Sequence, residues 1–200
     1  MLYPFSHIRS DIIKTAYACY FAEIVHHWME PNAVQTQVFD LLYQVLDRLD
    51  SSRLPDEILS IVFQMALLTF SGISPCLDTC CLCHAEMNRL NENRIRVNIT
   101  KGGIICNSCG RDSAPGLYLS RAAIKQLQWM ECGNWNKISR IRFSSGFIQE
   151  ALKFLEVFVP YHLGKEPRSL SVLQKLRNAR SAEPSLAIHP PCEPQTSFHA

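Results

Sequence analysis

Long apolar runs are missing from this sequence of 200 residues. The longest, such as IVFQMALLTF, reach about half of the ~20 residues that a membrane-spanning helix needs. The N-terminus, MLYPFSHIRS, has no basic stretch followed by an apolar one, which argues against a secretory signal. We therefore expect a cytoplasmic protein. In that reducing compartment, clustered cysteines more often bind a metal or take part in catalysis than form disulfides.

Common catalytic motifs are also missing. Gly102 and Gly103 stand in a turn that no helix follows, so no phosphate-binding loop is indicated, and the sequence contains no G-x-S-x-G. The adjacent His26 and His27 lie beside the apolar stripe of an expected helix, which favours surface or packing roles. The sequence therefore does not indicate an enzyme or a small-molecule substrate.

Charge is distributed unevenly along the chain. Residues 1–88 carry a net charge of −6, whereas residues 89–200 carry +8. A basic half predicts an anionic partner, although two solvated faces of opposite charge would give the same pattern. With 47% hydrophobic residues, the chain has enough apolar material for a real core.

Apolar residues recur at helical spacing in most of the chain. We expect Ser10 to cap the first helix and Pro31 to stop it. The helix at 144–160 is the most hydrophobic, so we expect it to be central and buried. The predicted helices cover residues 10–30, 35–50, 55–71, 120–131, 144–160 and 169–180.

A different pattern separates the third and fourth helices. Ile95, Val97 and Ile99 alternate with polar residues, which is typical of a strand, and Ile104 and Ile105 follow the turn KGG as a return strand. The predicted fold is mainly α, a helical bundle-like domain with a small β-rich insert. We expect N-terminal helices in 1–75, the insert in 76–112, further helices of the same domain in 113–182 and a disordered tail in 183–200.

Two C-x-x-C pairs, Cys80/Cys83 and Cys106/Cys109, lie in the insert with 22 residues between them. A two-residue turn lets both thiolates of a pair reach one ion, and the hairpin brings the pairs together. Four thiolates in a closed tetrahedron favour a structural Zn²⁺, so we call residues 76–112 the zinc-ribbon insert.

The other cysteines of the chain have no clear place in this site. CLDTCCLC permits other pairings, but Cys76 and Cys81 do not form a two-residue knuckle, and we interpret them as bystander thiols. The isolated cysteines need no function; these are Cys19, Cys132 and Cys192.

The residues His84–Glu86 (HAE), followed by Cys106–Cys109 (CNSC), are similar to the H-x-E…P-C-x-x-C pattern of zinc deaminases. There His84 would bind zinc and Glu86 would move protons. Ile105 replaces the expected proline, however, the segment after His84 is strand-like, and Cys80 and Cys83 would close the position that a water needs.

The segment FQMALLTFSGISPCLDTCCLC resembles the centre of the bacterial RecO family of DNA repair proteins. The segment GGIICNSC resembles the second knuckle of that family, YACYFAEIV the helix that opens its C-terminal domain, and RSLSVLQKL its last helix. The resemblance spans about residues 7–177. Its matching positions are Phe63, Leu67, Leu68, Gly72, Pro75, Leu77, Cys80, Cys83, Gly102, Gly103, Cys106 and Cys109.

This resemblance implies a recombination mediator that uses no nucleotide. It would help anneal strands coated by single-stranded DNA-binding protein (SSB) and, with RecR, help load the RecA recombinase. The expected partners are SSB, RecR and single-stranded DNA, at the cytoplasmic nucleoid and away from membranes.

The chain departs from the family at two points. His84 stands where the family usually has glycine, and could distort the knuckle or offer a nitrogen ligand. Family members begin with an oligonucleotide-binding barrel of roughly 80 residues. This chain starts where the barrel should end, so we expect a mis-called start or a truncated relative. The alternative function is a truncated structural or interaction module that binds SSB or RecR without DNA activity.

Basic residues of the second half are candidates for contacts with phosphates or an acidic peptide. Arg94 and Arg96 share one face of the predicted strand, and Arg121 and Lys125 share a helix face at four-residue spacing. The full set of candidates is Arg94, Arg96, Lys101, Arg121, Lys125, Arg140 and Arg142.

Overall fold

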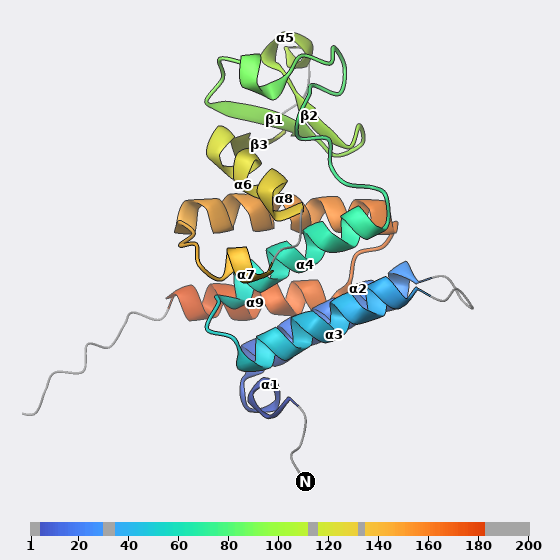
Figure 1. Cartoon of the computed structure of the whole chain (residues 1–200), viewed down its shortest axis with the longest axis vertical. Coiled ribbons are helices and arrows are strands. Elements are labelled where there is room, and N and C mark those ends of the chain that lie inside the picture. The colour runs from blue at the N-terminus through green and yellow to red at the C-terminus, as the bar shows by residue number, and fades with distance from the viewer. Residues whose placement is uncertain (1–4, 30–34, 112–115, 132–134, 183–200) are drawn as a thin grey trace, which may run out of the picture.

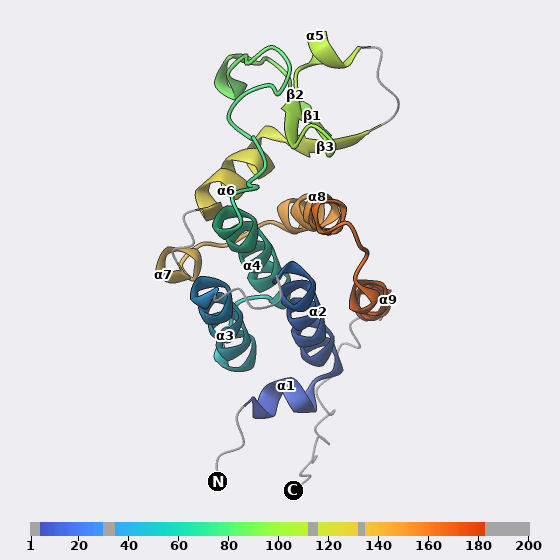
Figure 2. The same cartoon turned by 90° about the vertical axis from the view of Figure 1, so that its right-hand side faces the viewer.

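The computed structural model describes residues 5–29, 35–111, 116–131 and 135–182. The helices form a bundle at one end of the long axis, and the cysteine-rich part with its small sheet lies at the other end (Figure 1). Figure 2 shows α2, α3, α4 and α8 nearly end-on, with α9 beside α2 and the short α1 beneath them. The bundle helices are α1 (Ser6–Ser10), α2 (Ile12–Trp28), α3 (Thr36–Ser51), α4 (Asp56–Phe70), α8 (Ser145–Leu163) and α9 (Arg168–Ala182).

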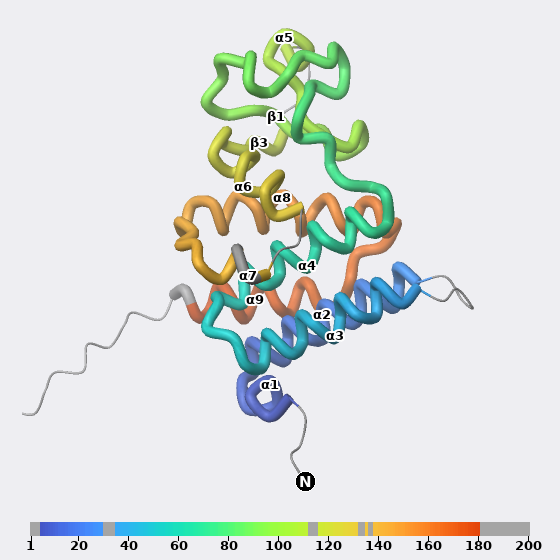
Figure 3. The backbone as a smooth tube through the Cα atoms, in the orientation of Figure 1, coloured from blue at the N-terminus to red at the C-terminus, as the bar shows by residue number. Residues whose placement is uncertain are grey.

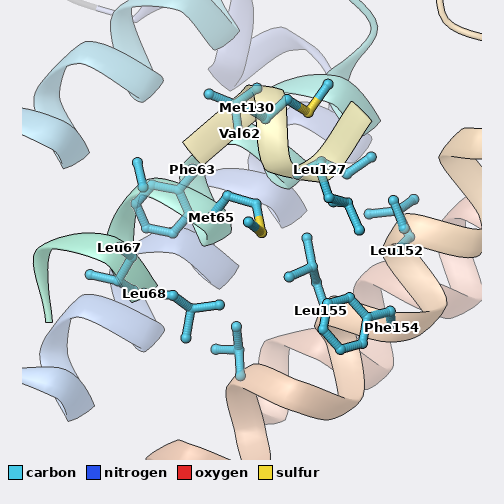
Figure 4. Packing of buried hydrophobic residues seen from close by; sticks show 14 of the residues in the cluster. Val62, Phe63, Met65, Leu67, Leu68, Leu127, Met130, Leu152, Phe154 and Leu155 are labelled. Atoms are coloured by element: carbon cyan, nitrogen blue, oxygen red, sulfur yellow. The ribbon is translucent and has the colours of Figure 1, made fainter. Parts of the chain in front are cut away.

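Helix α4 is the centre of the core. Every side chain from Ile58 to Leu67 is buried except for traces of exposure, because α4 packs against α2, α3, α6 and α8. Figure 4 shows Met65 pointing towards Leu127 of α6 and Leu155 of α8, whereas the Phe63 ring packs against Phe21 of α2. The segment 144–160 was predicted to be the central, buried helix. Most apolar side chains of α8 are buried, but its outer face is open to solvent, where Val157 is 49% exposed.

Two polar side chains, Ser60 and Gln64, are fully buried in the interior of α4, and both have hydrogen-bond partners. The Tyr20 hydroxyl of α2 donates to Gln64 Oε1 at 3.1 Å, and Gln64 Nε2 donates to Ser60 Oγ at 3.1 Å. A buried amide without partners would cost free energy, so this chain of bonds fixes how α2 and α4 face each other.

The predicted helices are present, but two of their ends differ from expectation. Asp11, not Ser10, caps α2: its carboxylate accepts from the backbone N–H groups of Ile13 and Lys14 at 2.8 and 3.1 Å. Ser10 instead ends α1, which the sequence pattern did not predict. Helix α8 continues through Pro160 to Leu163. Pro31 and the predicted tail lie outside the described residues.

The chain leaves the bundle after α4, builds the small sheet and returns through α6 (Arg121–Glu131), as the tube in Figure 3 shows. Strand β1 (Arg94–Asn98) lies between β2 (Gly103–Ile105) and β3 (Leu117–Ser120), and both pairings are antiparallel. Ile95 and Val97 point to the core, as the alternation predicts. Strand β3, which lies beyond the predicted insert, was not expected from the sequence.

Short elements complete the structure: η1 (Met87–Arg89), α5 (Asn107–Gly110) and α7 (Trp135–Ile138). The predicted fold class, a mainly helical domain with a small β-rich insert, is confirmed. None of the described helices is both long enough and apolar enough to cross a membrane.

Candidate metal centre

Two tight turns present the cysteines of the zinc-ribbon insert. In the first knuckle, His84 N–H donates to the Cys80 carbonyl at 2.9 Å, and Cys80 N–H donates to the Ala85 carbonyl at 2.9 Å. In the second, Cys106 precedes the single turn of α5, and Cys109 N–H donates back to the Cys106 carbonyl at 3.1 Å. Each knuckle therefore holds its two sulfurs on one side of the backbone.

The four knuckle sulfurs converge on one point. The Sγ atoms of Cys80, Cys83, Cys106 and Cys109 all lie within 4.8 Å of one another, and those of Cys83 and Cys106 are 3.6 Å apart. Zn–S bonds of about 2.3 Å in a tetrahedron require sulfurs about 3.8 Å apart. The donor set and its dimensions therefore suit one tetrahedral metal ion, and the exposed His84 does not belong to it.

The electrostatics of these thiols also favour a bound cation. Burial raises the pKa of the Cys80 thiol, but the backbone N–H groups of Cys106, Cys83 and Leu82 outweigh burial and lower it to about 6. The pKa of the Cys109 thiol is instead raised to about 12 by its hydrogen bonds with the Cys106 and Cys83 thiols. Closely spaced thiols cannot all ionise alone, whereas a divalent cation stabilises all four thiolates.

Two of the seven predicted binding residues are engaged within the protein. The Arg121 guanidinium donates to the backbone carbonyls of Leu90 and Asn88, which fixes the start of α6 to the insert. Arg96 packs over Gly116 and donates to the Gly110 carbonyl at 3.5 Å. Both arginines therefore stabilise the insert. The spacing of basic residues in the sequence does not show that these two bind backbone carbonyls of the protein itself.

The remaining predicted cations are exposed and lie on different elements. Lys101 lies in the β1–β2 turn, and Lys125 lies on α6. Arg140 and Arg142 lie between α7 and α8. Arg94, at the start of β1, lines a groove instead.

That groove, about 370 Å³ in volume, runs between the sheet and α8. Arg94, Tyr118 and Lys153 line it, and Tyr118 is 40% exposed. Glu150 in its wall accepts the backbone N–H of Ser120 at 2.8 Å, which ties β3 to α8. Neither Tyr118 nor Lys153 was predicted from the sequence, because β3 is short and Lys153 interrupts the most hydrophobic helix.

Comparison with known proteins identifies the family. A family model described as "Recombination protein O C terminal" matches residues 9–171. The chain is 39% identical over 173 residues to the DNA repair protein RecO of Desulfatibacillum aliphaticivorans, covering 86% of this chain and 67% of that protein. It is 37% identical over 182 residues to the DNA repair protein RecO of Desulfosudis oleivorans, covering 89% and 70%. The chain thus belongs to the RecO family, whose members act in DNA repair and recombination.

Proposed function

We propose that this chain acts without catalysis, as a mediator that helps complementary strands anneal and helps a recombinase load on SSB-coated single-stranded DNA. The observation that carries the proposal is the family match over residues 9–171, which includes both cysteine knuckles and most of the helical body. RecR is the further proposed partner, and the nucleoid is the proposed location. The division of the chain at residues 75, 112 and 182 stays a prediction.

The metal that we propose for the four-cysteine group is Zn²⁺ in a structural role. Thiolates are soft ligands, and four of them fill a tetrahedron and leave no position for a reactive water. The residues that a deaminase would use do not support catalysis, because His84 is outside the group and Glu86 pairs with Arg89 at 3.1 Å. We therefore expect no zinc-dependent release of ammonia from cytidine or adenosine. Ammonia release that Glu86→Ala abolishes would contradict this.

For single-stranded DNA we propose the groove between the sheet and α8. Single strands bind where cations follow the backbone and an aromatic ring stacks on a base. Arg94 and Lys153 supply exposed cations on opposite walls of the groove, and Tyr118 supplies the ring. Arg140 and Arg142, exposed before α8, add positive charge near its N-terminal end.

Fluorescence anisotropy with a labelled oligothymidine tests this surface. In Arg94→Ala/Lys153→Ala we expect weaker binding and a salt dependence whose slope falls by about 1.4, since each single-strand phosphate contact contributes about 0.7. Tyr118→Ala should lose about 1–3 kcal/mol of binding free energy with the slope unchanged, because stacking is not ionic. Arg53→Ala/Lys175→Ala, which removes two exposed cations outside the groove, is the charge-matched control. Equal binding by all variants would reject the groove.

An interaction module is the second candidate, favoured by the acid–base asymmetry of the chain. The acidic, apolar-ended tail of SSB needs cations and an apolar groove, and we expect an affinity of order micromolar for it. Lys125 is exposed on α6, whereas Arg121 holds the insert in place, so Lys125→Ala is the cleaner variant. Binding of a labelled tail peptide without any oligothymidine binding would favour this module over the mediator.

A further inference from the structure

Cys76 and Cys81 lie outside the four-cysteine group but against the same strand. Cys76 N–H donates to the Gly102 carbonyl at 2.8 Å, and the Cys76 carbonyl accepts from Ile104 N–H at 3.0 Å. Cys81 N–H donates to the Ile104 carbonyl at 2.9 Å. Three short backbone bonds thus hold the two cysteines at the start of β2, independently of the knuckle sulfurs.

The two side chains converge over Gly103. A methyl group built there would lie 2.8 Å from Cys76 Cβ and 2.8 Å from Cys81 Sγ, and it would also collide with the Cys76 carbonyl oxygen. Cys76 Cβ and Cys81 Sγ therefore share the space that the missing side chain leaves, and the two side chains lie side by side. A disulfide places its two Cβ atoms about 3.5–4.5 Å apart. To form one, the Cys76 side chain turns its sulfur from Thr79 towards Cys81.

The thiols differ in access to solvent. Cys76 is exposed, and its Sγ contacts the carbonyl and the hydroxyl of Thr79 at 3.5 Å each. Cys81 is half-buried behind it. An oxidant from solvent reaches Cys76 first, and Cys81 is positioned to react with the product.

We propose that Cys76 and Cys81 form a peroxide-responsive thiol pair, separate from the metal ligands, that closes to a disulfide. A peroxide transfers one oxygen to Cys76 and leaves as water or an alcohol, which gives a sulfenic acid. The Cys81 sulfur then attacks that sulfur, the S–O bond breaks, and the oxygen leaves as water. The two thiols together lose two hydrogen atoms, and the peroxide is reduced.

Closure fastens the first knuckle to the segment that leaves α4. The disulfide joins the two flanks of the turn that ends at Cys80, so it restrains this turn whether or not the metal is bound. The thiol pair would act in regulation or protection. Its oxidation does not require that the groove binds DNA or that α6 binds SSB.

The test uses the full chain, loaded with zinc, with Cys19, Cys132 and Cys192 replaced by serine. After treatment with hydrogen peroxide, free thiols are alkylated and the chain is cut before Asp78, which separates Cys76 from Cys81. Mass spectrometry should find the two resulting peptides joined through Cys76 and Cys81, with the zinc content unchanged. Dithiothreitol should reverse the link.

Cys76→Ser and Cys81→Ser serve as the variants, and their zinc content before oxidation verifies folding. Each should abolish the link and leave the zinc in place. The proposal fails if no link forms in the parent chain. It also fails if the link uses Cys80, Cys83, Cys106 or Cys109 and zinc is released in proportion.

Discussion

His84 adopts a backbone conformation that histidine rarely takes. Its φ is 59°, in the left-handed region, where a Cβ atom costs roughly 1–2 kcal/mol. The knuckle still closes, because His84 N–H bonds to the Cys80 carbonyl while the ring stays exposed. The expectation that this histidine distorts the turn or replaces a ligand therefore has no support in the geometry. The left-handed conformation of His84 instead produces local backbone strain.

Replacing this residue by glycine should stabilise the protein. We expect His84→Gly to raise the free energy of unfolding by about 0.5–1 kcal/mol, since glycine removes the left-handed strain but has a more flexible unfolded state. Urea denaturation of metal-loaded protein measures the change. His84→Ala keeps the Cβ atom and should bring no gain. Equal stability of the glycine and alanine variants would contradict the strain argument.

The four proposed ligands should be distinguishable from their neighbours by metal analysis. We expect close to one equivalent of zinc per chain, lost in Cys106→Ser because a hydroxyl is a poor ligand beside three thiolates. Much of the stability of the insert should disappear with the metal, seen as loss of protease resistance in residues 76–112. Cys81→Ser is the matched control and should keep the zinc. Loss of zinc in Cys76→Ser or His84→Ala, but not in Cys80→Ser, would show another ligand set.

At the scale of elements, one carboxylate joins two helices that are distant in the sequence. Glu23 of α2 accepts hydrogen bonds from the backbone N–H groups of Arg168 and Ser169 at 2.9 Å each. These are orphan donors at the start of α9, so a side chain from another helix acts as the cap. Burial raises the pKa of Glu23, but these bonds, the Ser169 hydroxyl and nearby His27 lower it overall to about 2.

This cap predicts an acid-dependent contribution to stability. The folded pKa lies below the unfolded value of about 4.5, so the contribution is full above that pH and declines as the pH falls towards 2. Glu23→Gln should therefore lower the free energy of unfolding by about 1–2 kcal/mol at pH 7, and the difference should shrink between pH 4.5 and 2. Urea denaturation of both proteins across this range measures it. A difference independent of pH would refute the charged cap.

At the scale of the molecule, a buried ion pair fastens α9 to α8. The Arg177 guanidinium binds Glu156 in bidentate fashion, at 2.7 and 2.9 Å, and Gln174 donates to the same carboxylate at 2.9 Å. The Glu156 side chain is only 5% exposed. Together with the Glu23 cap, this pair attaches α9 to both sides of the bundle. Removing one partner of such a pair lowers the free energy of unfolding by more than the intact pair contributes to it, because the other charge stays buried without a partner.

We expect Arg177→Met to destabilise the bundle by about 3–5 kcal/mol, since Glu156 is left buried without its cation. Thermal and urea unfolding would measure the loss. The double variant Glu156→Leu/Arg177→Met should recover most of it, because two apolar side chains of similar volume fill the site. Arg180→Met, an exposed cation in the last turn of α9, is the control. A double variant no more stable than Arg177→Met would contradict a penalty from buried charge.

The sequence by itself determined the long helices and the spacing of the cysteines. Apolar periodicity located every bundle helix except the five-residue α1, and period-two alternation located β1. Both signals are local, repeating within a few residues, so no knowledge of distant contacts was needed. The two knuckles are equally local patterns, and the β1–β2 hairpin lies between them in the chain.

Only the tertiary structure decided how charged and reactive side chains are used. Arg121 is held by Leu90 and Asn88, about thirty residues away, and β3 pairs with β1 across a comparable separation. Lys153 faces a groove because the sheet packs beside α8, and Cys76 meets Cys81 because Gly103 leaves room. These uses depend on contacts between residues that are distant in the sequence or on different strands, and no periodic pattern encodes them.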